Sequence, residues 1–258
     1  MIWHSPQTLN RTSSALIALA VGVLLYGAAR VFLGMGAYAL QTLTISHPGA
    51  PALQRVTRAQ IAEIAENEIR GNFFSVEMTA VQAAFEKLPW VRSAQVRRQW
   101  PAGLEVELVE HVALARWNQH GNVADDETLL LNTHGEVFNA RSDEKLPSLS
   151  GPPAAAAEVA QQYRRLQAML EPLRQRIDAL DLSKRRAWRV ELAANTTAAV
   201  RVAGITLKLG RAEQESGIEK RLARYIAAQD YMQKRFAEQR VAYVDLRYAQ
   251  GFAVRVVR

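Results

Sequence analysis

Side chains that could carry out chemistry are few and scattered along this chain of 258 residues. No cysteine is present, which excludes thiol catalysis, thiolate metal sites and disulfides. The five histidines show neither HxH nor HxxxH spacing: His4, His47, His111, His120 and His134. The acidic run 125–127 has the pattern of a solvated loop, and no GxSxG, SxxK or phosphate-binding glycine loop occurs. We therefore predict no catalytic, cofactor-binding or metal site.

The side chains best suited to binding another protein lie near the C-terminus. Val244, Leu246 and Tyr248 fall on one face of an alternating segment, and Asp245 and Arg247 fall on the other. Arginine pairs well with a partner carboxylate, and tyrosine combines a large apolar contact area with a hydroxyl. The segment 241–257 is therefore predicted to be a strand that carries the candidate binding residues.

That strand has two interpretations. A chain-terminal strand is often an edge strand, whose free N–H and C=O groups can accept a partner strand by β-augmentation. Alternatively, Tyr248, Phe252 and Val254 are core residues of a closing strand, which the apolar pattern alone favours. Residues 249–251 interrupt the alternation, and Gly251 marks either a bulge or a tight turn.

A β-hairpin is predicted within 88–117, where Pro101-Ala-Gly103 separates two alternating runs. If the turn closes symmetrically, Arg97 stands opposite Glu107. One face of the hairpin is apolar: Ala94, Val96, Leu104, Val106 and Leu108.

Two amphipathic helices are expected before the hairpin. Their apolar residues recur at helical spacing: Ile61, Ile64, Ala65 and Ile69 in the first, and Met78, Val81, Phe85 and Leu88 in the second. Pro89 ends the second helix. With a strand over 40–46, the predicted order is β-α-α-β-β.

A second, β-rich domain is expected from about residue 114 onward. It opens with a strand over 114–117 and a strand-turn-strand in LLLNTHGEVF, with Gly135 in the turn. Residues 146–153 have the composition of a loop, and helices are predicted over 154–170 and 215–236. Four alternating stretches predict an antiparallel sheet: IDALDL, WRVEL, AAVRV and ITLKL.

An apolar segment near the N-terminus is long enough to span a membrane. An uncharged run of about 17 residues ends at Ala29, and VFLGMGAYAL follows Arg30, which together can cross roughly 30 Å of hydrocarbon. A cleaved signal peptide is the alternative, because Ala37-Tyr38-Ala39 has the small-x-small form of a cleavage site. The run exceeds the usual apolar core of about 7 to 15 residues in a signal peptide, which favours an uncleaved anchor.

The net charge of +7 and the pI near 9.9 raise the question of nucleic-acid binding. The basic residues are spread along the chain without interleaved aromatic platforms or glycine-rich loops. Acidic protein partners or anionic headgroups therefore fit the charge better than nucleic acid does.

Several motifs resemble a known family. The β-α-α-β-β order with GNFF after the first helix is similar to a POTRA domain. LPWVRSAQVRRQWP followed by LVEHVALARW resembles the bacterial division family FtsQ, called DivIB in Gram-positive bacteria. The resemblance continues in the same order through RRAWRVEL, LKLGR, KRLARY and YVDLRYAQGFAVR, and so covers nearly the whole chain.

The resemblance implies protein partners and the residues that contact them. It implies that FtsB, arriving with FtsL, binds the terminal strand and a helical region near the RRxW motif. The corresponding positions are Arg185, Arg247, Tyr248, Gly251 and, as a weak contact, Phe252. It also implies that FtsK is recruited at Val96 and Arg98, with FtsW and FtsI as further partners.

The expected fold class is α+β with one transmembrane helix. The expected divisions are a cytoplasmic tail over 1–12, a transmembrane helix over 13–36, a POTRA domain over 40–112 and an FtsQ-type β domain over 114–258. The resemblance implies an inner-membrane protein of the division septum with its C-terminal domains in the periplasm. It implies a scaffold, not an enzyme, that links early and late division proteins and helps control septal peptidoglycan synthesis. The alternative is a POTRA docking module of an outer-membrane assembly or secretion system.

Overall fold

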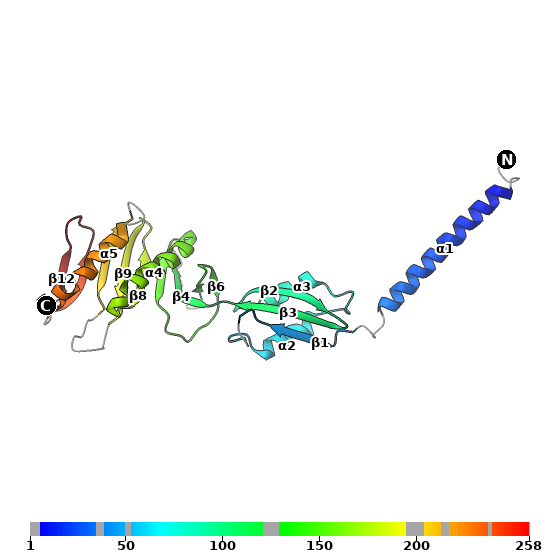
Figure 1. The fold of residues 1–258 in the computed structure, drawn as a ribbon, viewed down its shortest axis with the longest axis horizontal. Helices are drawn as coiled ribbons and strands as arrows, with labels where there is room; N and C mark the ends of the chain where they lie inside the picture. The colour runs from blue at the N-terminus through cyan, green and yellow to red at the C-terminus, as the bar shows by residue number, and fades with distance from the viewer. Residues whose placement is uncertain are drawn as a thin grey trace. The chain divides into compact units, whose positions relative to one another are not determined.

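The computed structural model describes residues 6–34, 39–49, 53–120, 129–194, 204–212, 217–236 and 239–257. Figure 1 shows the ribbon, which divides into two compact units, Met1–Glu110 and His111–Arg258. The expected α+β class is confirmed: an apolar N-terminal helix, a β-α-α-β-β fold and a β-rich part with helices follow one another along the chain.

The first helix, α1 (Pro6–Gly34), has 29 residues. At about 1.5 Å per residue it is roughly 43 Å long. Its window Arg11–Ala28 has a mean hydropathy of 1.5 and is not buried against the rest of the chain. Length and composition therefore make α1 able to cross a membrane.

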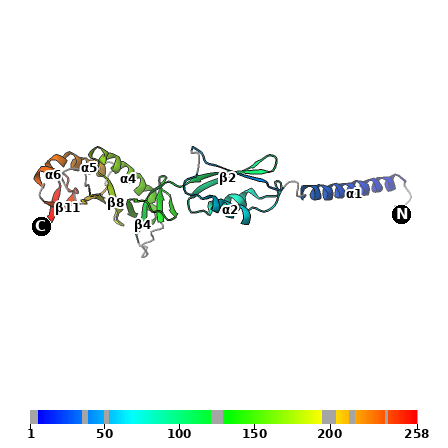
Figure 2. The ribbon, with the colours of Figure 1, turned by 90° about the horizontal axis from the view of Figure 1, so that it is seen from below.

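The remainder of the first unit is a three-stranded sheet with two helices on one face (Figures 1 and 2). Its elements are β1 (Thr42–Ser46), α2 (Arg58–Asn67), α3 (Met78–Glu86), β2 (Val91–Gln99) and β3 (Gly103–Glu110). The sheet order is β1-β3-β2, with β1 parallel to β3 and β2 antiparallel to it. α2 starts in a capping box, because Thr57 and Gln60 bond to each other's backbone N–H.

The hairpin of β2 and β3 has the predicted apolar face but a different register. Ala94, Leu104 and Leu108 are buried. The strands close at Gln99 opposite Gly103, so Arg97 stands opposite Glu105. The expected partner, Glu107, lies opposite Gln95. The prediction was wrong by two residues because the loop contains Trp100, Pro101 and Ala102, so it is centred on Pro101.

Glu110, at the end of β3, holds the loop before α2. Its carboxylate accepts hydrogen bonds from the backbone N–H groups of Gln54, Arg55 and Val56, at 2.7 to 2.8 Å. These N–H groups lie outside any strand or helix, and a carboxylate is a strong acceptor for them. One side chain thus ties the last strand of the unit to the start of its first packed helix.

The second unit is built on a nine-stranded sheet with helices over one face (Figures 1 and 2). The strand order is β12-β11-β10-β9-β8-β7-β4-β5-β6. Its strands are β4 (Ala113–Gln119), β5 (Leu129–Asn132), β6 (Val137–Asn139), β7 (Ser148–Gly151), β8 (Ile177–Leu182), β9 (Ala187–Leu192), β10 (Thr206–Arg211), β11 (Arg240–Asp245) and β12 (Ala253–Val257). Its α-helices are α4 (Ala156–Leu170), α5 (Gly217–Ala227) and α6 (Gln229–Arg235).

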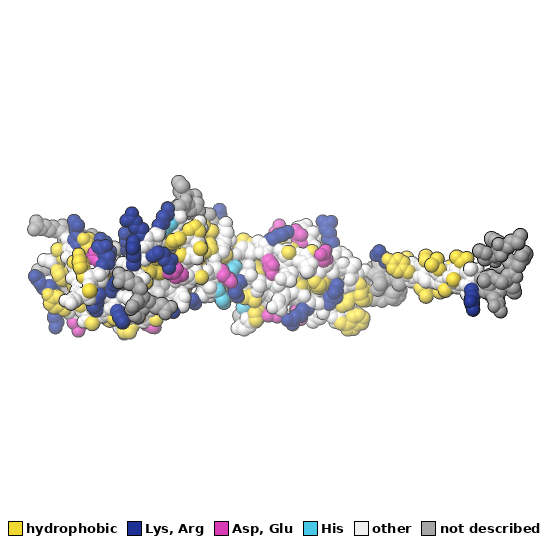
Figure 3. Space-filling model, turned by 90° about the horizontal axis from the view of Figure 1, so that it is seen from above, with side chains coloured by type: hydrophobic (Ala, Val, Ile, Leu, Met, Phe, Trp, Pro, Cys, Tyr) yellow, Lys and Arg dark blue, Asp and Glu magenta, His cyan; other side chains and the backbone are white. Residues whose placement is uncertain are grey.

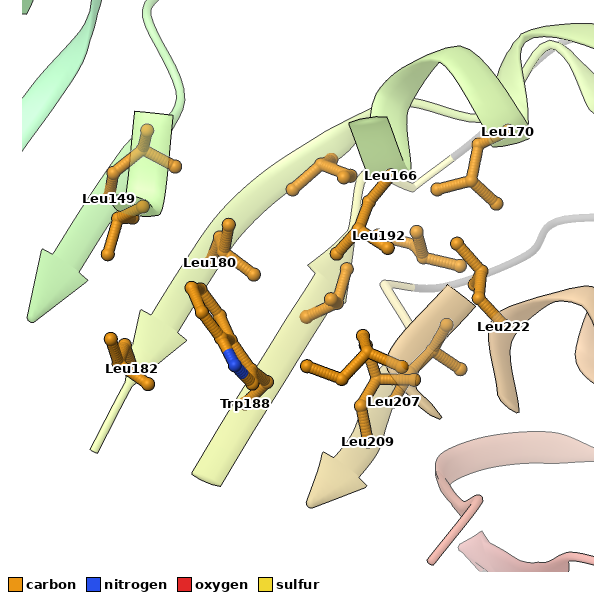
Figure 4. Close-up of a cluster of buried hydrophobic side chains, with 14 of the residues drawn as sticks. Leu149, Leu166, Leu170, Leu180, Leu182, Trp188, Leu192, Leu207, Leu209 and Leu222 are labelled. Carbon is orange, nitrogen blue, oxygen red and sulfur yellow. The ribbon is translucent and has the colours of Figure 1, made fainter. Parts of the chain in front are cut away.

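Leucines from the strands and helices form the core of this unit, as Figure 4 shows. Leu166 and Leu170 of α4 and Leu222 of α5 point toward the sheet and are fully buried. The strands contribute Leu149, Leu180, Leu182, Trp188, Leu192, Leu207 and Leu209. Fully burying each such side chain stabilises the folded state by about 1.5–3 kcal/mol, so this core holds the helices against one face of the sheet. Polar side chains can then occupy the opposite face.

Several details of the second unit differ from expectation. The predicted loop 146–153 contains β7, which lies mid-sheet and pairs in parallel with β4 and β8. β10 and β11 are also parallel, so the sheet is mixed rather than purely antiparallel. The helix expected over 215–236 is two helices, separated at Ala228. The predicted stretch AAVRV lies outside the described residues.

We predict that Glu110→Ala destabilises the first unit by about 2–3 kcal/mol, because three backbone donors lose a charged acceptor. Hydrogen exchange of the 53–67 backbone should accelerate strongly. Glu107→Ala, on the same strand, is the matched control and should leave this exchange unchanged. Equal hydrogen-exchange rates of the 53–67 amides in the two variants would show that the loop is not held by Glu110.

Candidate functional site at the sheet edge

The last strand, β12, forms one edge of the nine-stranded sheet (Figure 1). It pairs antiparallel with β11, and within the described ranges no strand pairs with its outer side. The predicted terminal strand is thus a hairpin of β11 and β12, joined by residues 246–252. Every second residue of an edge strand directs its N–H and C=O outward, so β12 can accept another strand.

Cross-strand register assigns the two faces near this edge. Leu207, Val244 and Val254 lie opposite one another on the buried face. The next row on the other face runs from Asp181 through Arg189, Lys208 and Asp245 to Ala253. Arg255 adds a further cation, 6.0 Å from the Tyr243 ring, over which Lys208 also lies. The edge therefore has an apolar side and a side rich in cations.

Arg247 is held in place before it meets any partner. Its Nε and Nη2 donate to the Asp245 carboxylate at 2.8 and 2.6 Å, yet 60% of its side chain remains exposed. Its stem packs on Gly210, where a Cβ would come within 2.9 Å of the Arg247 Cγ. Gly210 also has φ +76°, which favours glycine. The glycine of LKLGR thus makes room for this arginine.

Arg224 of α5 supports the loop between β11 and β12. Its guanidinium donates to the carbonyl oxygens of Tyr248 at 3.0 Å, Ala249 at 2.7 Å and Leu246 at 3.4 Å. Above this anchor the Tyr248 side chain is 57% exposed, so it is not a core residue. The motif KRLARY contains Arg224, but the sequence assigned it no role; its place in the last turn of α5, where a basic side chain can reach nearby carbonyl groups, was the available signal.

The other predicted edge residues differ in environment. Phe252 is partly buried against the core. Ala249 and Gln250 form a turn and Gly251 directly follows it, so the interruption of the alternation is a turn. A Cβ at Gly251 would meet no atom within 4 Å. No contact within the described chain requires glycine at this position.

Arg185 lies in the turn between β8 and β9, not in a helical region. The flanking Ser183 and Ala187 line a hollow of about 150 Å³ that Arg247 also lines. The neighbouring Arg186 is engaged, since it donates to Glu158 through both terminal nitrogens. The structure thus brings exposed Arg185 to the same part of the sheet as Arg247.

Val96 and Arg98 belong to the first unit and have structural partners there. Val96 is partly buried in the hairpin. The Arg98 guanidinium donates to the carbonyl oxygens of Phe73 at 2.7 Å, Val76 at 3.1 Å and Phe74 at 3.4 Å. Arg98 therefore holds the GNFF loop.

One group has the composition of a hydrolytic triad without its geometry. The Ser150 hydroxyl donates to Asp181 at 2.7 Å, and His120 Nε2 lies 2.8 Å from the same carboxylate oxygen. The serine thus bonds the carboxylate, not an imidazole that could accept its proton. Among the described residues no group of three or more His, Asp or Glu side chains could hold a metal ion. The contacts of Asp181 with Ser150 and His120 link β8 to β7 and to the residue after β4.

We predict that Arg224→Met loosens the 246–249 loop while α5 stays packed, because methionine keeps much of the apolar stem but donates nothing. Loss of a charged donor costs about 1–2 kcal/mol locally, so exchange of the 246–252 amides should rise about tenfold. Exposed Lys220→Met on the same helix is the control and should not change it. Unchanged exchange in Arg224→Met would refute the anchoring role.

A second prediction concerns pH. The hydrogen bond from Arg247 holds the pKa of the Asp245 carboxyl below its ordinary value of 3.8. Because the folded-state pKa is the lower one, this contact stabilises the fold above about pH 4 and is lost as the pH falls through the folded-state pKa. As the pH is lowered, the hydrogen-exchange protection of the β11–β12 amides should fall less steeply in Asp245→Asn than in the parent. Asp178→Asn, at an exposed site on β8, is the control and should lose protection with falling pH as steeply as the parent. An equal pH dependence in all three proteins would show that the Asp245–Arg247 contact does not contribute to stability.

Comparison with known proteins identifies the family. The model described as "Cell division protein FtsQ/DivIB, C-terminal" matches residues 115–247, and "POTRA domain, FtsQ-type" matches 52–111. A Nitrosospira multiformis protein called cell division protein FtsQ is 38% identical over 258 residues, covering 100% of both chains.

Other relatives with the same name match over nearly their full length. The Burkholderia pseudomallei protein is 33% identical and covers 98% of this chain and 94% of the relative. The Bordetella pertussis protein is 30% identical and covers 98% and 92%, respectively. The chain belongs to the FtsQ/DivIB family of cell division proteins, and with its apolar helix it is a membrane-anchored member.

Proposed function

We propose that the chain is a division scaffold: a single-pass inner-membrane protein at the division septum that binds other division proteins outside the membrane. In this proposal it links early and late division proteins and helps control septal peptidoglycan synthesis. The open edge of β12, beside an oriented Arg247, is the observation that carries the proposal.

The topology we propose has residues 1–12 in the cytoplasm and a transmembrane segment over 13–36. Residues 13–34 of this segment belong to α1, and 35–36 lie outside the described residues. The POTRA domain over 40–112 and the β domain over 114–258 then lie in the periplasm. Family membership and the apolar helix support this assignment.

FtsB is proposed to add a strand to β12, arriving together with FtsL. Ladder hydrogen bonds would supply sequence-independent affinity, and side chains on the two faces would supply specificity. Gly251 supports this route, since the space around it leaves room for a backbone to approach.

The two faces of the edge define the partner's chemistry. Beside Val254 and Phe252, a partner strand would place apolar residues. On the opposite face, acidic residues of the strand would meet Arg247 and Arg255. Arg185, in the turn between β8 and β9, would contact a further acidic segment of the partner that extends beyond the strand. Tyr248 at the loop would add apolar contact with a hydroxyl, and exposed aromatic and arginine side chains are common binding hot spots.

A separate surface is proposed for FtsK in the first unit, at Val96 and Arg98. Because Arg98 bonds three backbone carbonyls, a substitution there also disturbs the GNFF loop. Val96 is thus the better position for testing recruitment. FtsW and FtsI are proposed as further partners.

We expect Tyr248→Ala in the full chain, purified in detergent, to lose capture of FtsB and FtsL from a bacterial extract. Removing one central aromatic contact typically costs 2 kcal/mol or more, about 30-fold in affinity. Tyr231→Ala is the matched control, because Tyr231 is 63% exposed but lies on α6. It should capture both partners as the parent does.

Arg247→Glu should lose capture as well, since the new carboxylate repels an acidic partner. Circular dichroism should show all three variants folded. Capture by Tyr248→Ala equal to that by Tyr231→Ala would contradict the edge-strand assignment. Retention of outer-membrane assembly factors by the parent, without division proteins, would contradict the scaffold itself.

A further inference from the structure

Outside α1, the described surface of the first unit exposes large hydrophobic side chains at one place. Among its described residues, Phe74 and Trp100 are the large hydrophobic side chains that are exposed, by 44% and 73%. They come from separate segments, the GNFF loop before α3 and the loop joining β2 to β3. Figure 3 shows hydrophobic side chains gathered at one end of this unit.

These side chains form one cluster. The Phe73 ring lies under both, with ring centroids 5.2 Å from Phe74 and 6.0 Å from Trp100 in edge-to-face arrangements. Phe73 itself is buried, so it anchors the two exposed rings to the domain. We call Phe73, Phe74 and Trp100 the aromatic tip.

Hydrogen bonds with one charged and one neutral side chain hold the backbone of the tip. Arg98 donates to the carbonyls of Phe73, Phe74 and Val76, which fixes the GNFF loop against β2. Asn72 Oδ1 accepts from the backbone N–H groups of Phe74 and Ser75 at 3.0 Å. The exposed rings are thus presented by a well-braced loop, which lowers the entropy lost when they are covered.

The chain reaches this same end of the domain from α1. Ala39 forms a bridge with Asn72, and the Gln41 N–H donates to the Ala102 carbonyl at 2.9 Å. The first described residues after α1 therefore contact the two loops that carry Phe74 and Trp100.

Covalent geometry limits how far the tip can lie from α1. Five Cα-to-Cα steps separate Gly34, the last residue of α1, from Ala39. Fully extended, they span at most about 18 Å. The polar headgroup zone on each side of a bilayer is only about 5–8 Å thick. A helix that crosses the membrane thus keeps the tip within reach of the surface.

The chemistry of the tip suits that surface. Tryptophan and other aromatic side chains concentrate at membrane–water interfaces, where the ring is covered and polar groups stay hydrated. Arg70 and Arg97 are exposed beside the two loops, where their guanidinium groups can interact with anionic lipid headgroups. The covalent link to α1 keeps the tip near the bilayer, whereas no such link keeps it near a partner protein.

We propose that the aromatic tip docks into the outer leaflet's headgroup region and sets the β1–β3 domain against the bilayer surface. The proposal rests on α1 spanning the membrane and is independent of the partner-binding edge at β12. Docking adds a second membrane contact to the single helix.

The absence of cysteine from the chain allows a direct test. Trp100→Cys and Phe74→Cys are each labelled with a nitroxide in the full chain. The protein is reconstituted in vesicles of phosphatidylethanolamine and phosphatidylglycerol. Collision with oxygen, which dissolves in lipid, is compared with collision with a water-soluble nickel chelate. Lys87→Cys is the control, since Lys87 is exposed next to the far end of β2, a strand about 30 Å long.

Docking predicts that labels at 74 and 100 show raised oxygen collision and a several-fold loss of nickel collision relative to the label at 87. Equal nickel collision at all three positions would overturn the proposal. Low collision with both reagents at 74 and 100 would indicate contact with protein, and would overturn it too.

Two further measurements separate this idea from the function proposed above. Resistance of the reconstituted protein to carbonate extraction reports whether α1 is integrated. The docking labels in a Tyr248→Ala background should give the same depth, because that side chain belongs to the other unit. A changed depth there would contradict the independence of the two surfaces.

Discussion

Backbone N–H and C=O groups in loops need hydrogen-bond partners that strands and helices do not supply. In this chain, charged side chains meet that need at the positions on which the rest depends. Glu110 accepts from three N–H groups before α2, Arg98 donates to three carbonyls in the GNFF loop, and Arg224 does the same between β11 and β12. Arg221 likewise donates to the Leu209 and Arg211 carbonyls at the end of β10. The loops are fixed by side chains from distant elements.

The same arrangement recurs at the two exposed aromatic sites. In each, an arginine bonds the carbonyls beneath a loop, and an aromatic side chain is left exposed above it: Phe74 over Arg98, and Tyr248 over Arg224. A rigid aromatic group loses little conformational freedom when it is covered. Some of the arginines that give the chain its positive charge thus serve to position exposed aromatic side chains. Composition alone would indicate only a basic surface.

The sequence predicted what local periodicity encodes. The hairpin, the two helices before it and the β-α-α-β-β order followed from residues close together in the chain. β7 was missed because Ser148–Gly151 is short, with small polar residues beside one buried leucine, and its place mid-sheet depends on parallel neighbours far away in sequence. Arg224 was missed for a related reason. Its contacts lie 22 to 25 residues away and leave no periodic trace. Arg185, Arg247 and Tyr248 could be named from motifs. Gly210, which packs against Arg247, and Arg224, which bonds the Tyr248 carbonyl, have roles that depend on the folded chain.

The hairpin of β11 and β12 joins the sheet through a narrow parallel contact, with register pairs only at Thr206–Tyr243, Leu207–Val244 and Lys208–Asp245. Parallel pairing is slightly weaker per residue than antiparallel pairing. Opening of this hairpin would break that short ladder and withdraw Val244 and Leu246 from the leucine-rich core. A strand that binds the closed hairpin and not the open one lowers the open population by mass action. Occupation of the β12 edge would therefore protect the β11–β12 hairpin against opening, in proportion to the fraction of chains that carry the added strand.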